Sequence, residues 1–120
     1  MDLNEITYRI NGSIFEVNQV LGSGFLEKVY ENAMMIELKE RGLSVERQVP
    51  IKIAYKGHEV GDYFADIVVE GKVILELKAV SSLEKIHEAQ LLNYLKATGF
   101  KIGLLVNFTY PKAEVKRFIL

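Results

Sequence analysis

Apolar residues recur at three- and four-residue steps through the first third of the chain, which is the spacing of amphipathic helices. The pattern predicts one helix over residues 3–21, which Gly22-Ser23-Gly24 interrupts, and a second from Leu26 to Arg41. Gly42 then stands where a C-terminal cap belongs. The residues expected to face the core are Ile6, Ile10, Ile14, Val17 and Leu21, followed by Leu26, Val29, Ala33, Ile36 and Leu38.

The period then changes to the two-residue alternation of strands. Strands are predicted over about 49–55, 59–69 and 73–80. Ser81 or Ser82 is expected to cap a helix that ends at Gly99, with no capping box and with Ile86, Leu92 and Leu95 packed on the sheet. A buried strand is predicted over 101–108, and the tail AEVKRFIL is expected to be a short helix or an edge strand.

The order α-α-β-β-β-α-β predicts an α/β fold in which helices flank a mixed sheet. No repeat, low-complexity tract or linker divides the sequence. We therefore expect residues 1–120 to form a single domain, a length at which a core forms without disulfides.

The second and third strands bring two carboxylates together. If Glu70-Gly71-Lys72 is a three-residue hairpin loop, Val69 pairs with Val73 and Asp66 lies opposite Glu76. Lys78, two residues further on, points to the same face. The register is an assumption, because a shift of one residue would move Asp66 out of line.

Two facing carboxylates among apolar residues need a positive partner. Lys78 supplies one charge, and Mg²⁺ or Mn²⁺, which prefer oxygen ligands, would supply more. Such an ion lowers the pKa of a bound water and stabilises charge on a phosphate, while Lys78 would orient that water or offset the phosphate charge. The alternative is that Asp66, Glu76 and Lys78 form an ordinary polar edge of the sheet.

Asp66 followed by Glu76-Leu77-Lys78 resembles the core motif of the PD-(D/E)XK nuclease superfamily. The segment GFLEKVY also resembles the signature of its GxxExxY family, with matching residues at Gly24, Glu27 and Tyr30. The resemblance implies a restriction-endonuclease-like fold and Mg²⁺-dependent phosphodiester cleavage. The proline of the superfamily motif is replaced here by Ala65.

The resemblance also implies roles for individual residues. Asp66, Glu76, the carbonyl of Leu77 and an acidic residue of an early helix, Glu27, would hold the metal ion. Glu27 and Glu31 share a helix face, and the alternative for both is a solvated surface.

The last predicted helix places Gln90 and Tyr94 on one arc, together with His87. Gln90 and Tyr94 resemble the QxxxY motif of RecB-like nucleases, which organises the active site and the nucleic-acid strand. A polar stripe at the edge of the core is the alternative. His87 is expected to be structural, as Tyr30 and Gly24 are.

The charge balance limits the mode of nucleic-acid binding. Fifteen Lys and Arg residues oppose sixteen Asp and Glu, giving a net charge of −1, whereas proteins that coat nucleic acid by charge alone are strongly basic. The absence of cysteine excludes thiol catalysis and zinc fingers and fits a cytoplasmic protein, with no signal peptide evident and no membrane partner expected.

Three functions remain open from the sequence. The first is a metal-dependent nuclease acting on DNA or RNA, with DNA as the favoured substrate. The second is a catalytically silent nuclease-like module that binds nucleic acid or a protein partner. The third is a dimerisation domain that uses the apolar final strand and tail, and the resemblance itself implies a homodimer.

Overall fold

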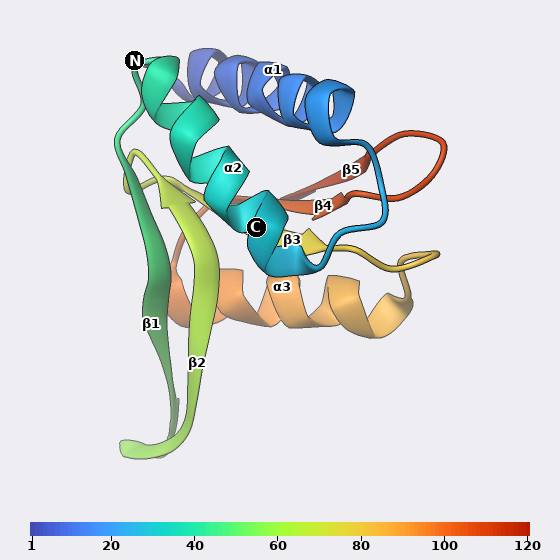
Figure 1. Cartoon of the computed structure of the whole chain (residues 1–120). Helices are drawn as coiled ribbons and strands as arrows, with labels where there is room; N and C mark the ends of the chain where they lie inside the picture. Colours follow the sequence, from blue (N-terminus) through green and yellow to red (C-terminus); the bar gives the residue numbers. More distant parts are fainter.

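A five-stranded sheet forms the centre of the molecule (Figure 1). The computed structural model describes all residues, Met1–Leu120. The strands lie in the order β1-β2-β3-β4-β5; β3 and β4 are parallel, and all other neighbours are antiparallel. The elements are α1 (Leu3–Leu21), α2 (Glu27–Glu40), β1 (Val45–Tyr55), β2 (His58–Val69), β3 (Val73–Lys78), α3 (Lys85–Thr98), β4 (Ile102–Asn107) and β5 (Glu114–Ile119).

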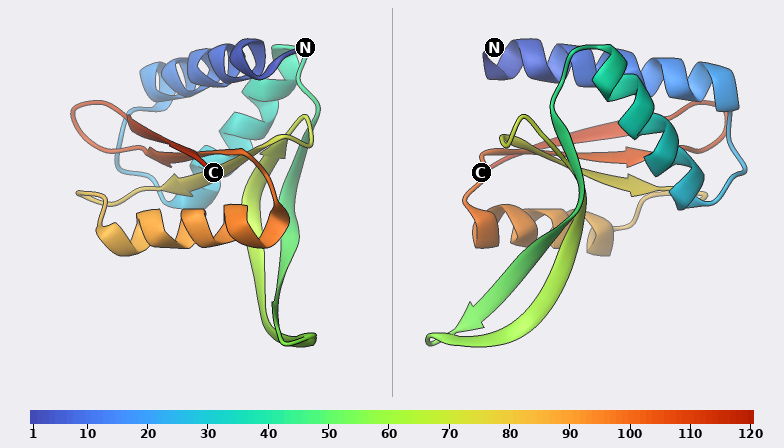
Figure 2. Two further views of the ribbon diagram at one scale, coloured as in Figure 1. Left: turned by 180° about the vertical axis from the view of Figure 1, so that it is seen from behind. Right: turned by 60° about the vertical axis from the view of Figure 1, so that its left-hand side comes forward.

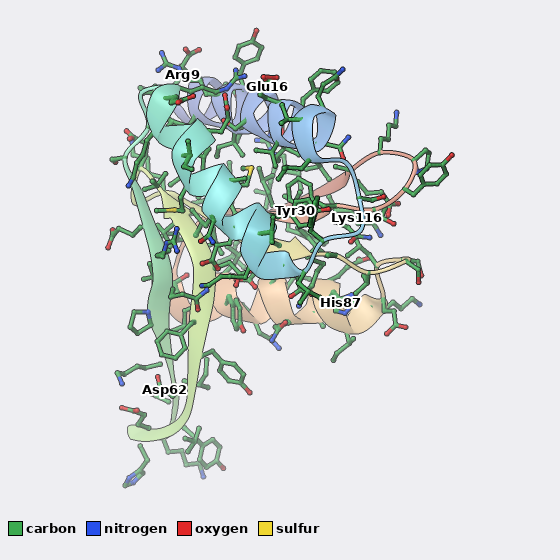
Figure 3. All side chains as sticks on the ribbon, in the orientation of Figure 1. Arg9, Glu16, Tyr30, Asp62, His87 and Lys116 are labelled. Carbon is green, nitrogen blue, oxygen red and sulfur yellow. The ribbon has the colours of Figure 1, made fainter.

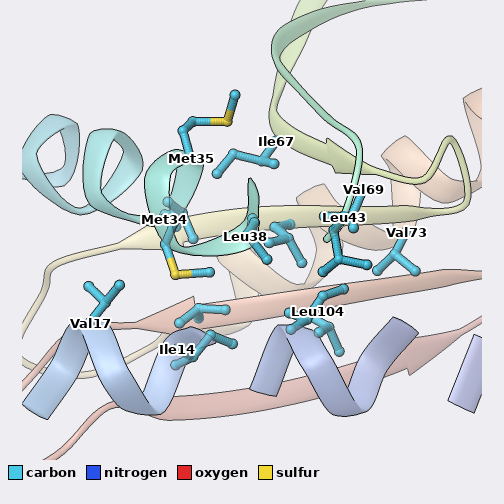
Figure 4. Close-up of a cluster of buried hydrophobic side chains, with 14 of the residues drawn as sticks. Ile14, Val17, Met34, Met35, Leu38, Leu43, Ile67, Val69, Val73 and Leu104 are labelled. Carbon is cyan, nitrogen blue, oxygen red and sulfur yellow. The ribbon is translucent and has the colours of Figure 1, made fainter. Parts of the chain in front are cut away.

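Helices cover both faces of the sheet, as predicted. Figure 2 shows α1 and α2 on one face and α3 on the other. The larger core cluster fills the α1–α2 side, where Ile14 and Met34 gather over sheet residues such as Val69 (Figure 4). A smaller cluster lies under α3 and includes Leu91 and Ile74. The mixed sheet flanked by helices is therefore confirmed.

The inward face of α2 differs from the predicted one. Leu26, Val29 and Ile36 are exposed, and the residues that the helix buries are Tyr30, Glu31, Met34, Met35 and Leu38. The apolar residues of this helix do not form a single stripe, so the sequence pattern left its rotation open. Contacts with α1 and the sheet select the face that carries Tyr30 and the methionines.

Helix α3 starts later than predicted and packs through a different residue. Lys85 is its first residue, Glu84 is the N-cap in place of the serines, and His87 completes a capping box by accepting a hydrogen bond at Nδ1 from the Glu84 backbone N–H, 3.1 Å away. Ile86 is exposed, whereas Leu91 is fully buried. A Cβ on Gly103 would lie 2.8 Å from a Leu91 methyl, so this glycine admits Leu91 to the sheet surface.

The strand ends also differ from the predicted limits. β1 begins at Val45 rather than residue 49, because Val45 continues the pairing opposite Val69. β3 ends at Lys78 rather than at Val80. The Val80 backbone instead pairs with the Asn107 side chain, whose amide donates to Val80 O and accepts from the Val80 N–H. The tail forms β5, so the edge-strand alternative was the correct one.

The outer part of the β1–β2 hairpin extends past α3 as a two-stranded projection (Figures 1 and 2). We call residues 52–63 the arm; Lys52 pairs with Asp62 within it. Asp62 lies well out along this projection (Figure 3). The three helices include none that is both long and apolar enough to cross a bilayer.

Tyr30 ties the loop between α1 and α2 to the core. Its hydroxyl donates to Gly22 O at 2.6 Å and accepts from the Phe25 N–H at 3.3 Å, while its ring stacks on Phe108 with centroids 4.3 Å apart. Figure 3 shows Tyr30 inside the body of the molecule. Tyr30 therefore has the structural role predicted for it.

Replacing Tyr30 with phenylalanine keeps the stacked ring but leaves both loop partners without the hydroxyl. We expect the free energy of unfolding to fall by about 1–2 kcal/mol. Urea denaturation would measure the change, with Tyr8→Phe on the exposed face of α1 as the control. Equal stability of the two variants would contradict this role for the hydroxyl.

Candidate metal and nucleic-acid site

Asp66 and Glu76 meet where the β2–β3 ladder ends. The pairs Val69–Val73, Val68–Ile74 and Ile67–Leu75 confirm the predicted register. At the next step each carboxylate binds the opposite backbone. The Asp66 N–H donates to Glu76 Oε1 at 3.1 Å, and the Leu77 N–H donates to Asp66 Oδ2 at 2.8 Å. The two acidic side chains are therefore held side by side.

The local sequence fixes this geometry through the hairpin loop. Glu70 and Gly71 both have positive φ angles, 54° and 61°. Glycine adopts this conformation without strain, and Glu70 is held in it by hydrogen bonds that its carboxylate accepts from the Ser44 N–H and hydroxyl, at 2.6 and 2.8 Å. The three-residue loop thus sets which residues face each other along the hairpin.

Both carboxyl groups resist ionisation. Burial, followed by the charge of Asp66, raises the pKa of Glu76 from its usual 4.5 to about 8. The pKa of Asp66 is also raised, chiefly by burial, against the opposing hydrogen bond from Leu77. Glu76 is only 6% exposed. The site therefore carries a carboxylate pair whose full ionisation requires an additional positive charge.

Lys78 provides part of that charge. Its ammonium lowers the pKa of both Asp66 and Glu76. It takes part in none of the ion pairs within 4 Å, which join other residues. The Lys78 amine is thus close enough to act on the pair electrostatically, while its hydrogen-bonding capacity remains free.

Glu31 of α2 is a buried acidic residue whose charge acts on Asp66. It is 5% exposed and binds three side chains: Lys28 Nζ at 2.9 Å, Gln48 Nε2 at 2.6 Å and Arg47 NH1 at 3.7 Å. The charge of Glu31 raises the pKa of Asp66 more than the charge of Glu27 does. Glu27, the residue singled out from the sequence, is exposed.

Gln48 is a neighbour of the site that the sequence did not indicate. Arg47 pairs with Ile67 and Val49 pairs with Ala65, so Gln48 falls opposite Asp66 without pairing to it. Its φ is 50°, a conformation that few non-glycine residues adopt. Because the local sequence carries no turn signal, only the structure identifies Gln48.

Helix α3 supplies Tyr94 to the same face. Tyr94 is only 5% exposed. Burial, followed by the charges of Glu76 and Asp66, raises the pKa of its phenol to about 12, whereas a hydrogen bond with the Gln90 side chain lowers it. The phenol therefore stays protonated and can donate a hydrogen bond. Gln90 is half-buried one turn earlier. His87, on the same helix (Figure 3), uses Nδ1 for the cap and does not join the carboxylates as part of a ligand cluster.

The donor set fits a hard divalent cation. No three acidic or histidine side chains converge as a preformed cage. Mg²⁺, however, usually keeps several waters and binds one or two carboxylates together with substrate phosphates. The Asp66–Glu76 pair supplies the carboxylate oxygens that such an ion requires, and a bound cation would favour their ionised form over the protonated one.

The chain is an α/β protein in which the central hairpin of a mixed sheet carries paired carboxylates and a lysine. The sequence matches the PD-(D/E)XK nuclease superfamily over residues 4–118, and the chain belongs to this superfamily. A comparison with curated proteins finds no matching sequence.

Comparison with solved structures finds one of similar fold and a second with a weaker likeness. The crystal structure of SSO0001 has a TM-score of 0.63 and 20% identity, over 77% of this chain and 48% of that one. An alkaline exonuclease from Laribacter hongkongensis has a TM-score of 0.46 and 14% identity, over 77% and 55%. The chain spans about half the length of both. The fold is therefore restriction-endonuclease-like, as the sequence resemblance implied.

Proposed function

We propose that this chain is a Mg²⁺- or Mn²⁺-dependent nuclease that hydrolyses phosphodiester bonds in DNA or RNA, with DNA as the favoured substrate. The observation that carries the proposal is the Asp66–Glu76 pair. The Glu76 carboxylate accepts from the Asp66 N–H, the Asp66 carboxylate accepts from the Leu77 N–H, and both carboxyl groups have raised pKa values. A protein gains no stability from two like carboxylates forced together, so the arrangement is best explained by a cation that the pair binds.

The roles follow from these positions. Asp66, Glu76 and the Leu77 carbonyl would hold the ion, and the buried Glu31 is better placed than the exposed Glu27 to act on this site from α2. When bound, the ion would lower the pKa of a water molecule and offset charge on the phosphate. Lys78, whose amine takes part in no ion pair, would bind a phosphate oxygen or orient the attacking water.

Gln90 and Tyr94 would contact the substrate without titrating. An amide hydrogen-bonds without changing its charge, and Tyr94, with a pKa of about 12, remains a donor at neutral pH. We assign both residues to positioning the strand or Lys78.

We also propose membership of the GxxExxY family within the superfamily. Its three signature residues have distinct situations here. Gly24 has a φ of 109°, which favours glycine, Tyr30 holds the same loop, and Glu27 is exposed at the start of α2. The signature would thus preserve the α1–α2 loop beside the site.

The proposal is tested by titrating Mg²⁺ and Mn²⁺ calorimetrically into the wild type and into an Asp66→Asn/Glu76→Gln variant. The same samples are assayed on DNA and RNA. We expect the variant, which retains both hydrogen-bond acceptors, to lose metal binding and to lose cleavage by at least about 10²-fold. Metal-independent cleavage, or equal metal affinity in both proteins, would refute the proposed site.

A catalytically silent module that binds nucleic acid or a protein is the second candidate. The net charge of −1 and the lack of a three-carboxylate cage favour it. Such a module would bind nucleic acid with a salt-sensitive affinity that does not change with Mg²⁺. A homodimer through the edge strand β5, where Val115 and Ile119 are exposed, remains a separate prediction that light scattering would test.

A further inference from the structure

A cavity of about 730 Å³ lies between the arm and α3. The arm contributes Ile53 and Tyr63 to its walls, and the helix contributes Ile86, Gln90, Asn93 and Tyr94. Its volume is in the range of pockets that hold small organic groups, and its walls are mostly apolar with two amides among them. Gln90 and Tyr94 also belong to the QxxxY motif, but neither that motif nor the carboxylate pair accounts for the wall that the arm contributes.

Tyr94 connects the cavity to the candidate site. It lines the cavity, and it packs in one hydrophobic cluster with Ala65, the residue before Asp66. A molecule that contacts Tyr94 from the cavity therefore lies on the α3 side of the hairpin that carries the carboxylate pair. Gln90, half-buried on the same wall, could accept or donate a hydrogen bond to that molecule.

Two tyrosines form the aromatic part of the cavity. The rings of Tyr63 and Tyr94 have centroids 5.8 Å apart and are tilted by 49°. Tyr63 stands on the arm and is 47% exposed, so part of its ring surface has no protein partner. Exposed aromatic rings beside a nuclease site offer a stacking surface for bases, all of which have a π-face.

The charges around the cavity argue against a site that binds nucleic acid through its phosphates alone. Lys52, on the arm side, is engaged by Glu59 at 3.3 Å and Asp62 at 3.8 Å. Lys96 is a second cation there, but the whole chain is slightly acidic. A protein that follows duplex phosphates needs many free cations. Affinity here must come largely from uncharged contacts with bases.

We propose that the cavity binds an unpaired nucleobase against Tyr63, so that the preferred substrate is single-stranded or frayed nucleic acid. This inference rests on the proposed nuclease function and adds the substrate class. Bases inside an intact duplex are stacked on their neighbours and cannot enter the cavity. An unpaired strand that anchors one base there would place an adjoining phosphate on the side of Tyr94 that faces the carboxylates.

The test compares binding of three fluorescent probes without divalent ions, so that no cleavage occurs. The probes are a short oligothymidylate, an abasic strand of equal length, and a blunt duplex. We expect the wild type to bind the oligothymidylate at least about 10-fold more tightly than the abasic strand, because one base–aromatic contact contributes about 1–3 kcal/mol. Tyr63→Ala should remove most of this difference, and Tyr63→Phe should retain it.

Two further variants test whether a loss of binding in Tyr63→Ala comes from the cavity itself. Tyr55→Ala, on the arm but outside the cavity lining, should bind as the wild type does. Ala89→Phe, which fills the cavity from α3, should weaken oligothymidylate binding while leaving Tyr63 in place. Equal affinity for the base-containing and abasic strands, or full binding by both Tyr63→Ala and Ala89→Phe, would overturn the inference.

The two proposals fail separately. Metal-dependent cleavage by the wild type, combined with no effect of Tyr63→Ala on binding, would leave the nuclease function standing and overturn the base-binding cavity. Discrimination between base-containing and abasic strands, combined with no cleavage under any metal condition, would support the cavity and refute catalysis.

Discussion

Lys78→Ala is expected to abolish phosphodiester cleavage while the protein remains folded. The Lys78 amine is the one cation that lowers the pKa of both site carboxylates. Removing a positioned charge from the reacting centre of an enzyme costs on the order of 10³-fold in rate. The fold should survive, because this half-buried amine forms no ion pair that holds two elements together.

The measurement is the single-turnover rate at saturating Mg²⁺, with circular dichroism as the test of folding. Lys72→Ala is the matched control, since it removes an exposed lysine from the same hairpin. Lys78→Arg keeps the charge but changes its shape and should restore only part of the rate. Wild-type cleavage by Lys78→Ala would disprove the role of this lysine.

The second large effect is expected on stability. Glu76→Gln should make the metal-free protein more stable at pH 8, by about 2–4 kcal/mol, or roughly 10 °C in melting temperature. Folding raises the pKa of Glu76 from 4.5 to about 8. The folded state therefore holds a proton that the unfolded chain releases. This contribution is complete below pH 4.5 and is lost as the pH rises through 8, whereas glutamine is neutral throughout.

Denaturation in the presence of a chelator, from pH 5 to pH 9, would measure this difference. The stability of the wild type should fall across that interval, and that of Glu76→Gln should fall much less. Adding Mg²⁺ should stabilise the wild type and not the variant, since binding to the folded state alone raises stability. Glu40→Gln, on the exposed end of α2, is the control. Parallel pH profiles of stability for the wild type and Glu76→Gln would show that folding does not raise the pKa of Glu76.

The sequence alone determined the parts of this protein that depend on local chemistry. The two-residue alternation and the Glu70-Gly71-Lys72 loop set the β2–β3 register, because a slip would turn every side chain to the opposite face. The meeting of Asp66 and Glu76 is therefore predictable from a short stretch of residues. The helix–strand order and the mixed sheet followed from the same periodicities.

Only the tertiary structure decided the features that depend on contacts between distant elements. The buried face of α2, and with it Glu31, was set by packing against α1 and the sheet, since the helix has no single apolar stripe. Gln48 reaches Glu31 through a backbone conformation that its sequence does not signal. The Tyr63–Tyr94 cavity exists because the arm extends past α3. Short-range periodicity carries no information about which distant surfaces meet, because that depends on the packing of the whole chain.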